Sequence, residues 1–295
     1  MLFYVFGLIS ALCFGISNVY WKSAGKSNSF PTLVFFRGIL ASIIFGIIWL
    51  EGSRYGYISN NLINSSGTFS QYIRAITLCI VCSFGLVFYL LSLQYSPVSI
   101  SVPISSINWF SILTAVFILG ENFKHIYYLS FSMSILGILF IKYKKNNSEM
   151  NNWNRGLTYS ILASLIWGVT YSLFKITAKW IGAIPLAFLL ESSVTIIAFF
   201  WIQFNAIENH KKWDRFSFMN IKHYSILSGL LIGGTLFFNL SIQRIPILVI
   251  NILGNFTLIT SILVGILFFK EKLSAKQIIG VLLLLLSIIM LQYPG

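Results

Sequence analysis

The chain has 295 residues, of which 57% are hydrophobic and only 9% are charged, and its formal net charge is +13. A soluble domain carries about 25% charged residues, so a chain this poor in charge cannot cover a water-facing surface and is predicted to lie in the lipid bilayer. Its basic residues lie mostly between apolar runs, as in the cytoplasmic loops of membrane proteins, which argues against nucleic acid as a partner.

Apolar runs long enough to cross a bilayer follow one another from the first residues onward. A spanning helix needs about 20 apolar residues, and helices are favoured because lipid cannot satisfy open backbone groups. The predicted spans are 2–21, 30–50, 72–95, 98–120, 126–142, 156–174, 181–205, 224–243, 246–269 and 277–293. The first run lacks a basic segment before it, so it is predicted to be a span rather than a removable signal. We therefore predict an all-α integral membrane protein with ten transmembrane helices.

Two prolines predict tight hairpins between neighbouring spans. No charged residue occurs between Ala75 and Gly120, a stretch long enough for two spans, and Pro97 divides it. Proline favours a turn or a helix start at such a point. Pro246 divides the eighth and ninth spans in the same way.

Short motifs recur with nearly constant spacing along the chain. The matched pairs are Phe14-Gly15 with Trp167-Gly168, Lys22 with Lys175, Pro31 with Pro185, Arg37 with Glu191, Gln94 with Gln243, Pro97 with Pro246, and Glu121 with Glu271, at offsets between 149 and 154. Each copy holds five spans, an odd number, so the second copy must enter the membrane inverted. Inverted repeats are typical of secondary transporters, with the substrate site between the halves. We predict a first repeat at 1–145, a polar linker at 146–155 and a second repeat at 156–295, arranged around a central cavity.

These features resemble a known family of membrane proteins. The two five-span repeats, the aromatic-Gly pairs in spans one and six, the Pro31 to Arg37 spacing of span two and the Gly120-Glu121 that ends span four are similar to the drug/metabolite transporter superfamily, and within it to the EamA-type transporters. The resemblance covers nearly the whole chain. It implies a ten-helix fold, alternating access, and substrates such as amino acids and other small metabolites, usually moved outward. The second half departs from the pattern where Glu191 stands in place of an arginine.

The loops predict an orientation. Thirteen basic residues fall in loops on one predicted side of the membrane and six on the other. The richer side is expected to be cytoplasmic, which places both termini outside. The expected location is the inner (cytoplasmic) membrane of a cell.

Two charged residues inside the spans are the first candidates for the solute site. Polar groups are costly in lipid and usually face an interior cavity. Arg37 and Glu191 occupy equivalent places in spans two and seven. They are predicted either to handle substrate or protons, or to form a structural ion pair.

Two polar stripes are the next candidates. Ser101, Ser105 and Asn108 recur at helical spacing in span four, and Asn251 and Asn255 recur in span nine, so each set shares one helix face. At an offset of 150 the first two serines match the two asparagines. The stripes are predicted to line a central site. The alternative is hydrogen bonding between helices, worth about 0.6–2 kcal/mol for each bond.

Further candidates combine aromatic rings with single polar groups. They are Asn18, Trp21, Tyr89, Trp167, Tyr171, Lys175 and Asn239. The rings could stack on a ligand or gate the cavity, but Trp21 fits equally well in the interfacial belt that aromatic residues form in membranes.

The leading functional prediction is a secondary transporter for a small-molecule solute, with amino acids first. Span one holds no acidic residue, which disfavours a proton-coupled exporter of drug cations. Sugar or nucleotide-sugar transport is the alternative, and a membrane enzyme or receptor is a remote one. No Walker A loop or clustered ligand motif occurs, so no cofactor, metal or catalytic residue is expected. Coupling to protons or a counter-solute, and the oligomeric state, stay open.

Overall fold

A computed structural model describes residues 2–25, 29–55, 67–96, 98–105, 109–121, 125–141, 150–209, 221–269 and 275–290. These ranges are almost entirely helical. The helices are α1 (Leu2–Ala24), α2 (Phe30–Tyr55), α3 (Phe69–Tyr95), α4 (Val98–Ser105), α5 (Trp109–Phe117), α6 (His125–Ile141), α7 (Met150–Ile181), α8 (Ala183–Asn209), α9 (Ile221–Ile242), α10 (Ile247–Phe269) and α11 (Ala275–Met290). The prediction of an all-helical fold is confirmed for this part of the chain.

Within the described residues, six helices are long and apolar enough to cross a membrane, namely α1, α2, α3, α7, α8 and α9. Val249–Val264 within α10 and Tyr128–Gly137 within α6 are shorter apolar helices. Large apolar side chains such as Leu50 and Phe204 are exposed on the outside of the bundle. The charged Arg37 and Glu191 are buried inside it. This distribution, apolar outside and polar within, suits a lipid environment.

Several helices are longer than their predicted apolar spans. Helix α7 begins at Met150, inside the predicted polar linker, and continues to Ile181. It ends only at Gly182, whose φ of 90° is favourable for glycine and breaks the helix before α8. Helix α3 begins at Phe69 because Thr68 and Gln71 form a capping box before it. Hydropathy marks the part of a helix in lipid, whereas the helix itself continues into water until a backbone signal ends it.

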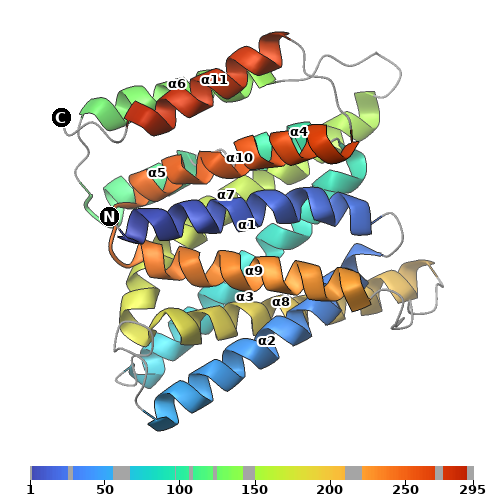
Figure 1. Cartoon of the computed structure of the whole chain (residues 1–295). Coiled ribbons are helices and arrows are strands. Elements are labelled where there is room, and N and C mark those ends of the chain that lie inside the picture. Colours follow the sequence, from blue (N-terminus) through green and yellow to red (C-terminus); the bar gives the residue numbers. More distant parts are fainter. Residues whose placement is uncertain are drawn as a thin grey trace.

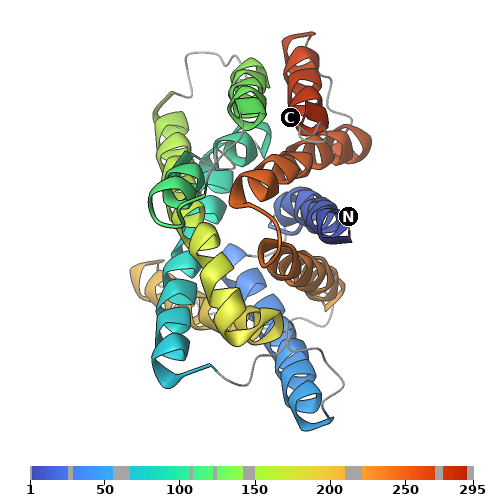
Figure 2. The same cartoon turned by 90° about the vertical axis from the view of Figure 1, so that its left-hand side faces the viewer.

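The helices form a bundle whose main contacts join distant parts of the sequence. Helix α1 packs between α9 and α10, and α7 packs against α3 and α5. Helix α2 packs against α8, and α6 pairs with α11 at one side of the bundle (Figures 1 and 2). Helices α1 and α7 run in opposite directions, and α1 begins at the end of the bundle where α11 finishes (Figure 1).

Two glycines let helices cross closely at the centre of the bundle. A Cβ atom on Gly15 of α1 would lie 2.6 Å from the Cβ of Thr260 on α10. A Cβ atom on Gly168 of α7 would lie 2.9 Å from the Cβ of Phe110 on α5. Small residues allow such close approach between membrane helices. The crossings fix the helices that surround the cavities described next.

Candidate functional site

Two adjoining cavities lie in the middle of the bundle. The larger has a volume of about 160 Å³ and is bordered by residues of α1, α3, α4, α5, α7, α9 and α10. The smaller, of about 90 Å³, lies between α1, α2, α3, α7, α8 and α9. Both volumes far exceed the roughly 10–15 Å³ that a cavity needs to hold one water molecule. Together they form a central chamber, with each cavity as one lobe.

Aromatic rings form the wall that both lobes share. The rings of Tyr89 and Trp167 lie 5.3 Å apart between centroids, and Trp167 stacks on Tyr171 at 5.9 Å with an interplanar angle of 17°. Tyr171 continues to Phe238 at 5.1 Å. Phe14 and these four residues line both cavities. Such a wall offers flat apolar surface, and ring edges and faces, to a solute in either lobe.

A polar group is fixed within this wall. The hydroxyl of Tyr89 donates to Oδ1 of Asn18 at 2.8 Å, and Nδ2 of Asn18 donates to Oγ of Ser261 at 3.4 Å. These bonds join α3, α1 and α10 and hold the Asn18 amide in one orientation. Asn18 also lines both cavities, so it is placed to read a polar group of the solute.

A second polar cluster lies beside the larger lobe. The hydroxyls of Ser111 and Ser172 share a hydrogen bond of 2.5 Å, and Nδ2 of Asn251 donates to Ser111 Oγ at 2.8 Å. Ser111 and Asn251 line the larger cavity. The cluster joins α5, α7 and α10 and presents hydroxyl and amide groups, but no charge, to the chamber.

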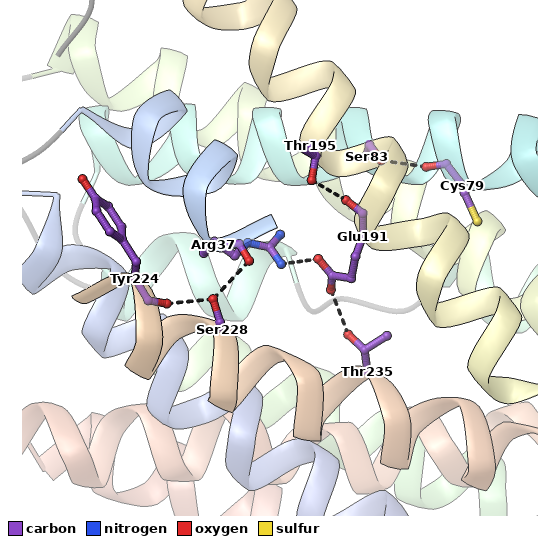
Figure 3. Close-up of polar contacts among 8 residues, drawn as sticks. All are labelled: Arg37, Cys79, Ser83, Glu191, Thr195, Tyr224, Ser228 and Thr235. Atoms are coloured by element: carbon purple, nitrogen blue, oxygen red, sulfur yellow. Dashed lines mark hydrogen bonds and ion pairs between the residues drawn. The ribbon is translucent and has the colours of Figure 1, made fainter. Parts of the chain in front are cut away.

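The only charges found among the described lining residues belong to one buried ion pair, Arg37 and Glu191 (Figure 3). The two side chains are each 3% exposed. Nη1 of Arg37 donates to Oε2 of Glu191, and Thr235 donates to Oε1 of Glu191 at a long 3.4 Å. The guanidinium also lies 5.9 Å from the ring centroid of Trp21. The pair borders the smaller lobe and gives the chamber no net formal charge.

Backbone contacts hold the helices that carry this pair. Ser228 of α9 donates to the carbonyl oxygen of Arg37 at 3.0 Å and also to that of Tyr224 at 2.7 Å. Thr195 donates to the carbonyl oxygen of Glu191 at 2.8 Å (Figure 3). Helices α2, α8 and α9 therefore meet at the ion pair.

A further ion pair joins α7 to a residue that follows the end of α5. Lys175 of α7 pairs with Glu121, and the Glu121 carboxylate also accepts the backbone N–H of Ile247 at 3.0 Å, at the start of α10. We call these three groups the terminal clasp. Gly120, with φ of 65°, lets the chain turn so that the N–H of Glu121 returns to the carbonyl of Ala115. The Gly-Glu motif thus ends α5 and ties it to α7 and α10.

The structure brings most of the predicted site residues to the chamber. Those that line it are Asn18, Trp21, Arg37, Tyr89, Ser105, Trp167, Tyr171, Glu191 and Asn251. The predicted residues outside both linings are Ser101, Lys175, Asn239 and Asn255. Ser101 bonds to Ser96 at 2.6 Å, Asn239 donates to the carbonyl of Ala183 at 3.3 Å, Lys175 belongs to the terminal clasp, and Asn255 is buried. Asn108 lies outside the described residues.

Five further lining residues were not among the predicted site residues. Phe14 and Phe238 line both lobes, and Ser111, Thr235 and Thr257 line one each. The repeat offered the best signal for Phe14, because it is the partner of Trp167 at an offset of 153. Ser111 follows the predicted stripe of span four by one further turn.

The class of protein follows from comparison of this sequence and fold with known proteins. The chain matches the EamA-like transporter family over residues 1–143 and 154–293, and it belongs to that family. It is therefore a membrane transporter. A solved structure described as "Crystal structure of protein" shares the fold, with a TM-score of 0.70, 11% sequence identity, and coverage of 98% of this chain and 95% of the other. No curated protein matches the chain.

Proposed function

We propose that the protein is a secondary transporter that carries a small metabolite through the central chamber by alternating access, and that its solute is an amino acid or a related compound moved outward. The observation that carries the proposal is the lining itself. Aromatic walls, amides and hydroxyls surround a chamber whose charges are paired with each other. Such a lining suits a solute with an apolar part, polar groups and no net charge.

The alternating-access mechanism rests on two halves, 1–145 and 156–295, that we propose to be inverted repeats. Exchanging the halves preserves the helix contacts, since α1 with α9 corresponds to α7 with α3, and α1 with α10 corresponds to α7 with α5. Close approaches are mirrored too. A Cβ on Gly234 would meet the ring of Phe14, and one on Gly85 would meet the ring of Trp167. The two separate family matches, 1–143 and 154–293, support the same division.

Sugar transport is the second candidate, and the stacked rings of Trp167 and Tyr171 favour it. Aromatic rings offer apolar faces to a sugar as well as to an apolar side chain. The buried ion pair favours the amino-acid candidate, because a sugar carries no charge to exchange with it.

Counterflow in proteoliposomes tests the proposal. Proteoliposomes that contain the purified full chain would be loaded in turn with each of the twenty standard amino acids, with neutral sugars and with nucleotides. Uptake of the same solute in labelled form would then be measured. We expect saturable exchange of at least one amino acid. Absence of saturable exchange across the whole panel, from protein shown to be folded by a cooperative melting transition, would overturn the proposal.

A matched pair of variants tests whether the solute passes through the chamber. Trp167→Leu removes a ring that lines both lobes, whereas Phe204→Leu changes a ring that is 68% exposed on the outer surface. We expect the first variant to lose transport and the second to retain it at equal expression. Equal activity of the two variants would show that the solute follows another path.

A further inference from the structure

We infer that the Arg37–Glu191 pair is a binding site for a zwitterionic head group, in which the solute carboxylate binds Arg37 and its ammonium group binds Glu191. This inference rests on the proposed function and names the chemistry that the smaller lobe recognises. It assigns the head group to the smaller lobe and the apolar side chain to the larger one. It also predicts that the ion pair opens and re-forms around each solute molecule.

Both poles of the pair have unused hydrogen-bonding capacity. Nε of Arg37 is buried and has no hydrogen-bond partner among the described residues. A guanidinium presents its donors in a planar fork that fits a carboxylate with two parallel bonds. Oε1 of Glu191 receives only a 3.4 Å bond from Thr235 within the described part of the chain. A solute that carries a carboxylate and an ammonium group on one carbon atom would supply an acceptor to Arg37 and a donor to Glu191 at the same time.

Charge balance restricts which solute can do this. Leaving one member of a buried ion pair without a partner costs about 3–5 kcal/mol. A zwitterion brings one charge of each sign, so every charge stays paired when the Arg37–Glu191 contact opens. A simple amine or a simple carboxylate would pair with one member only and leave the other unpaired. The pair therefore selects against solutes with a single charge.

The lining of the smaller lobe leaves room for a head group beside the ion pair and adjoins the larger lobe. The smaller lobe, of about 90 Å³, is bordered by both charged residues and by Leu190 and Val194 of the same helix as Glu191. The aromatic wall shared with the larger lobe forms another part of its lining. A head group at the pair thus lies next to the larger lobe, where an apolar side chain meets aromatic rings.

A purely structural pair is the competing explanation. A structural pair would join α2 to α8 regardless of the solute. Replacing such a buried pair by neutral residues is often without cost to stability, and it would leave solute preference unchanged. The two explanations therefore differ in selectivity, which an experiment can measure separately from folding.

The experiment compares L-leucine with three analogues that each lack part of the head group. L-Leucinamide and 3-methylbutylamine keep the ammonium group only, and 4-methylpentanoate keeps the carboxylate only. Inhibition of labelled leucine counterflow by each compound would be measured in proteoliposomes of the full chain. We expect unlabelled leucine to inhibit at least tenfold more strongly than any analogue. If leucine is not transported, the same comparison is made with whichever standard amino acid the wild-type protein exchanges.

Two double variants test the pair itself. R37Q/E191Q neutralises both members, and we expect the tenfold preference for the zwitterion to fall below about threefold. E121Q/K175Q neutralises the ion pair of the terminal clasp, which lies outside both cavity linings, and we expect it to retain the preference even if its rate changes. Melting temperatures of both variants show whether they fold, and R37M/E191L, which replaces the pair by hydrophobic residues, takes the place of R37Q/E191Q if that variant does not fold.

The outcomes separate this inference from the proposed function. Equal inhibition by leucine and its analogues, or an unchanged preference in folded R37Q/E191Q, would overturn the head-group site while leaving a transporter. Saturable exchange of sugars with none of any amino acid would overturn both the head-group site and the amino-acid assignment, while leaving a transporter. Only a wild-type protein that exchanges no solute at all would overturn the head-group site and the transporter together.

Discussion

Substitution of Gly15 by alanine tests the close crossing of α1 and α10. The new Cβ would lie 2.6 Å from the Cβ of Thr260 and 2.9 Å from the carbonyl oxygen of Thr257. Neither atom is the far end of a flexible side chain, so the two helices must separate. Such overpacking costs about 1–3 kcal/mol, and alanine recovers at most about 1 kcal/mol of helix propensity. We therefore expect a net loss of stability of about 1–2 kcal/mol.

Gly229→Ala is the matched control, because a Cβ there would meet nothing within 4 Å. Thermal unfolding of the purified variants in one detergent measures the difference. We expect Gly15→Ala to melt on the order of several degrees below Gly229→Ala. Gly168→Ala should behave like Gly15→Ala, since its Cβ would lie 2.9 Å from the Cβ of Phe110. If Gly15→Ala melted at or above the temperature of the control, the close crossing would be wrong.

Three further substitutions test the polar contacts around the chamber. Tyr89→Phe removes the hydroxyl that donates to Asn18. Losing this hydrogen bond, worth about 0.5–1.5 kcal/mol, should weaken the apparent solute affinity measured by counterflow roughly two- to tenfold. An unchanged affinity would refute a role of Tyr89 in binding. Glu121→Ala removes the carboxylate that accepts the backbone N–H at the start of α10, whereas Glu121→Gln keeps an acceptor oxygen. The alanine variant should therefore be about 1 kcal/mol less stable in thermal unfolding than the glutamine variant. Equal melting temperatures would contradict the capping contact. Asn251→Ala, in the cavity lining, should lower transport relative to expression more than Asn255→Ala, and equal losses would count against the lining.

Much of the site was predictable because the repeat carries spatial information. Arg37 and Glu191 are matched at an offset of 154, and they prove to be one ion pair between α2 and α8. Trp167 and Tyr171 were predicted as rings of span six that could stack on a ligand or gate the cavity, and both line the chamber. A charged residue is costly inside a span, so charged residues are few there and each one is informative.

The remaining residues could not be assigned because helical periodicity gives a face but not the neighbour of that face. Asn251 and Asn255 share one face of α10, yet only Asn251 lies in a cavity lining. Phe238 resembles the other phenylalanines of an apolar helix until packing places it against Tyr171. The extension of α7 before Gly156 was missed for a different reason: its first residues are polar, and hydropathy does not detect helix outside lipid.

The contact between Arg37 and Glu191 has a consequence for how this protein can change over evolution. Arg37 and Glu191 lie in different halves of the chain, and each neutralises the other where both side chains are only 3% exposed. A single substitution at either position would leave the charge of the other residue unpaired. Tolerated changes should therefore occur as correlated replacements of both residues. Among relatives, positions 37 and 191 should therefore co-vary, with both charged, both neutral, or the signs exchanged.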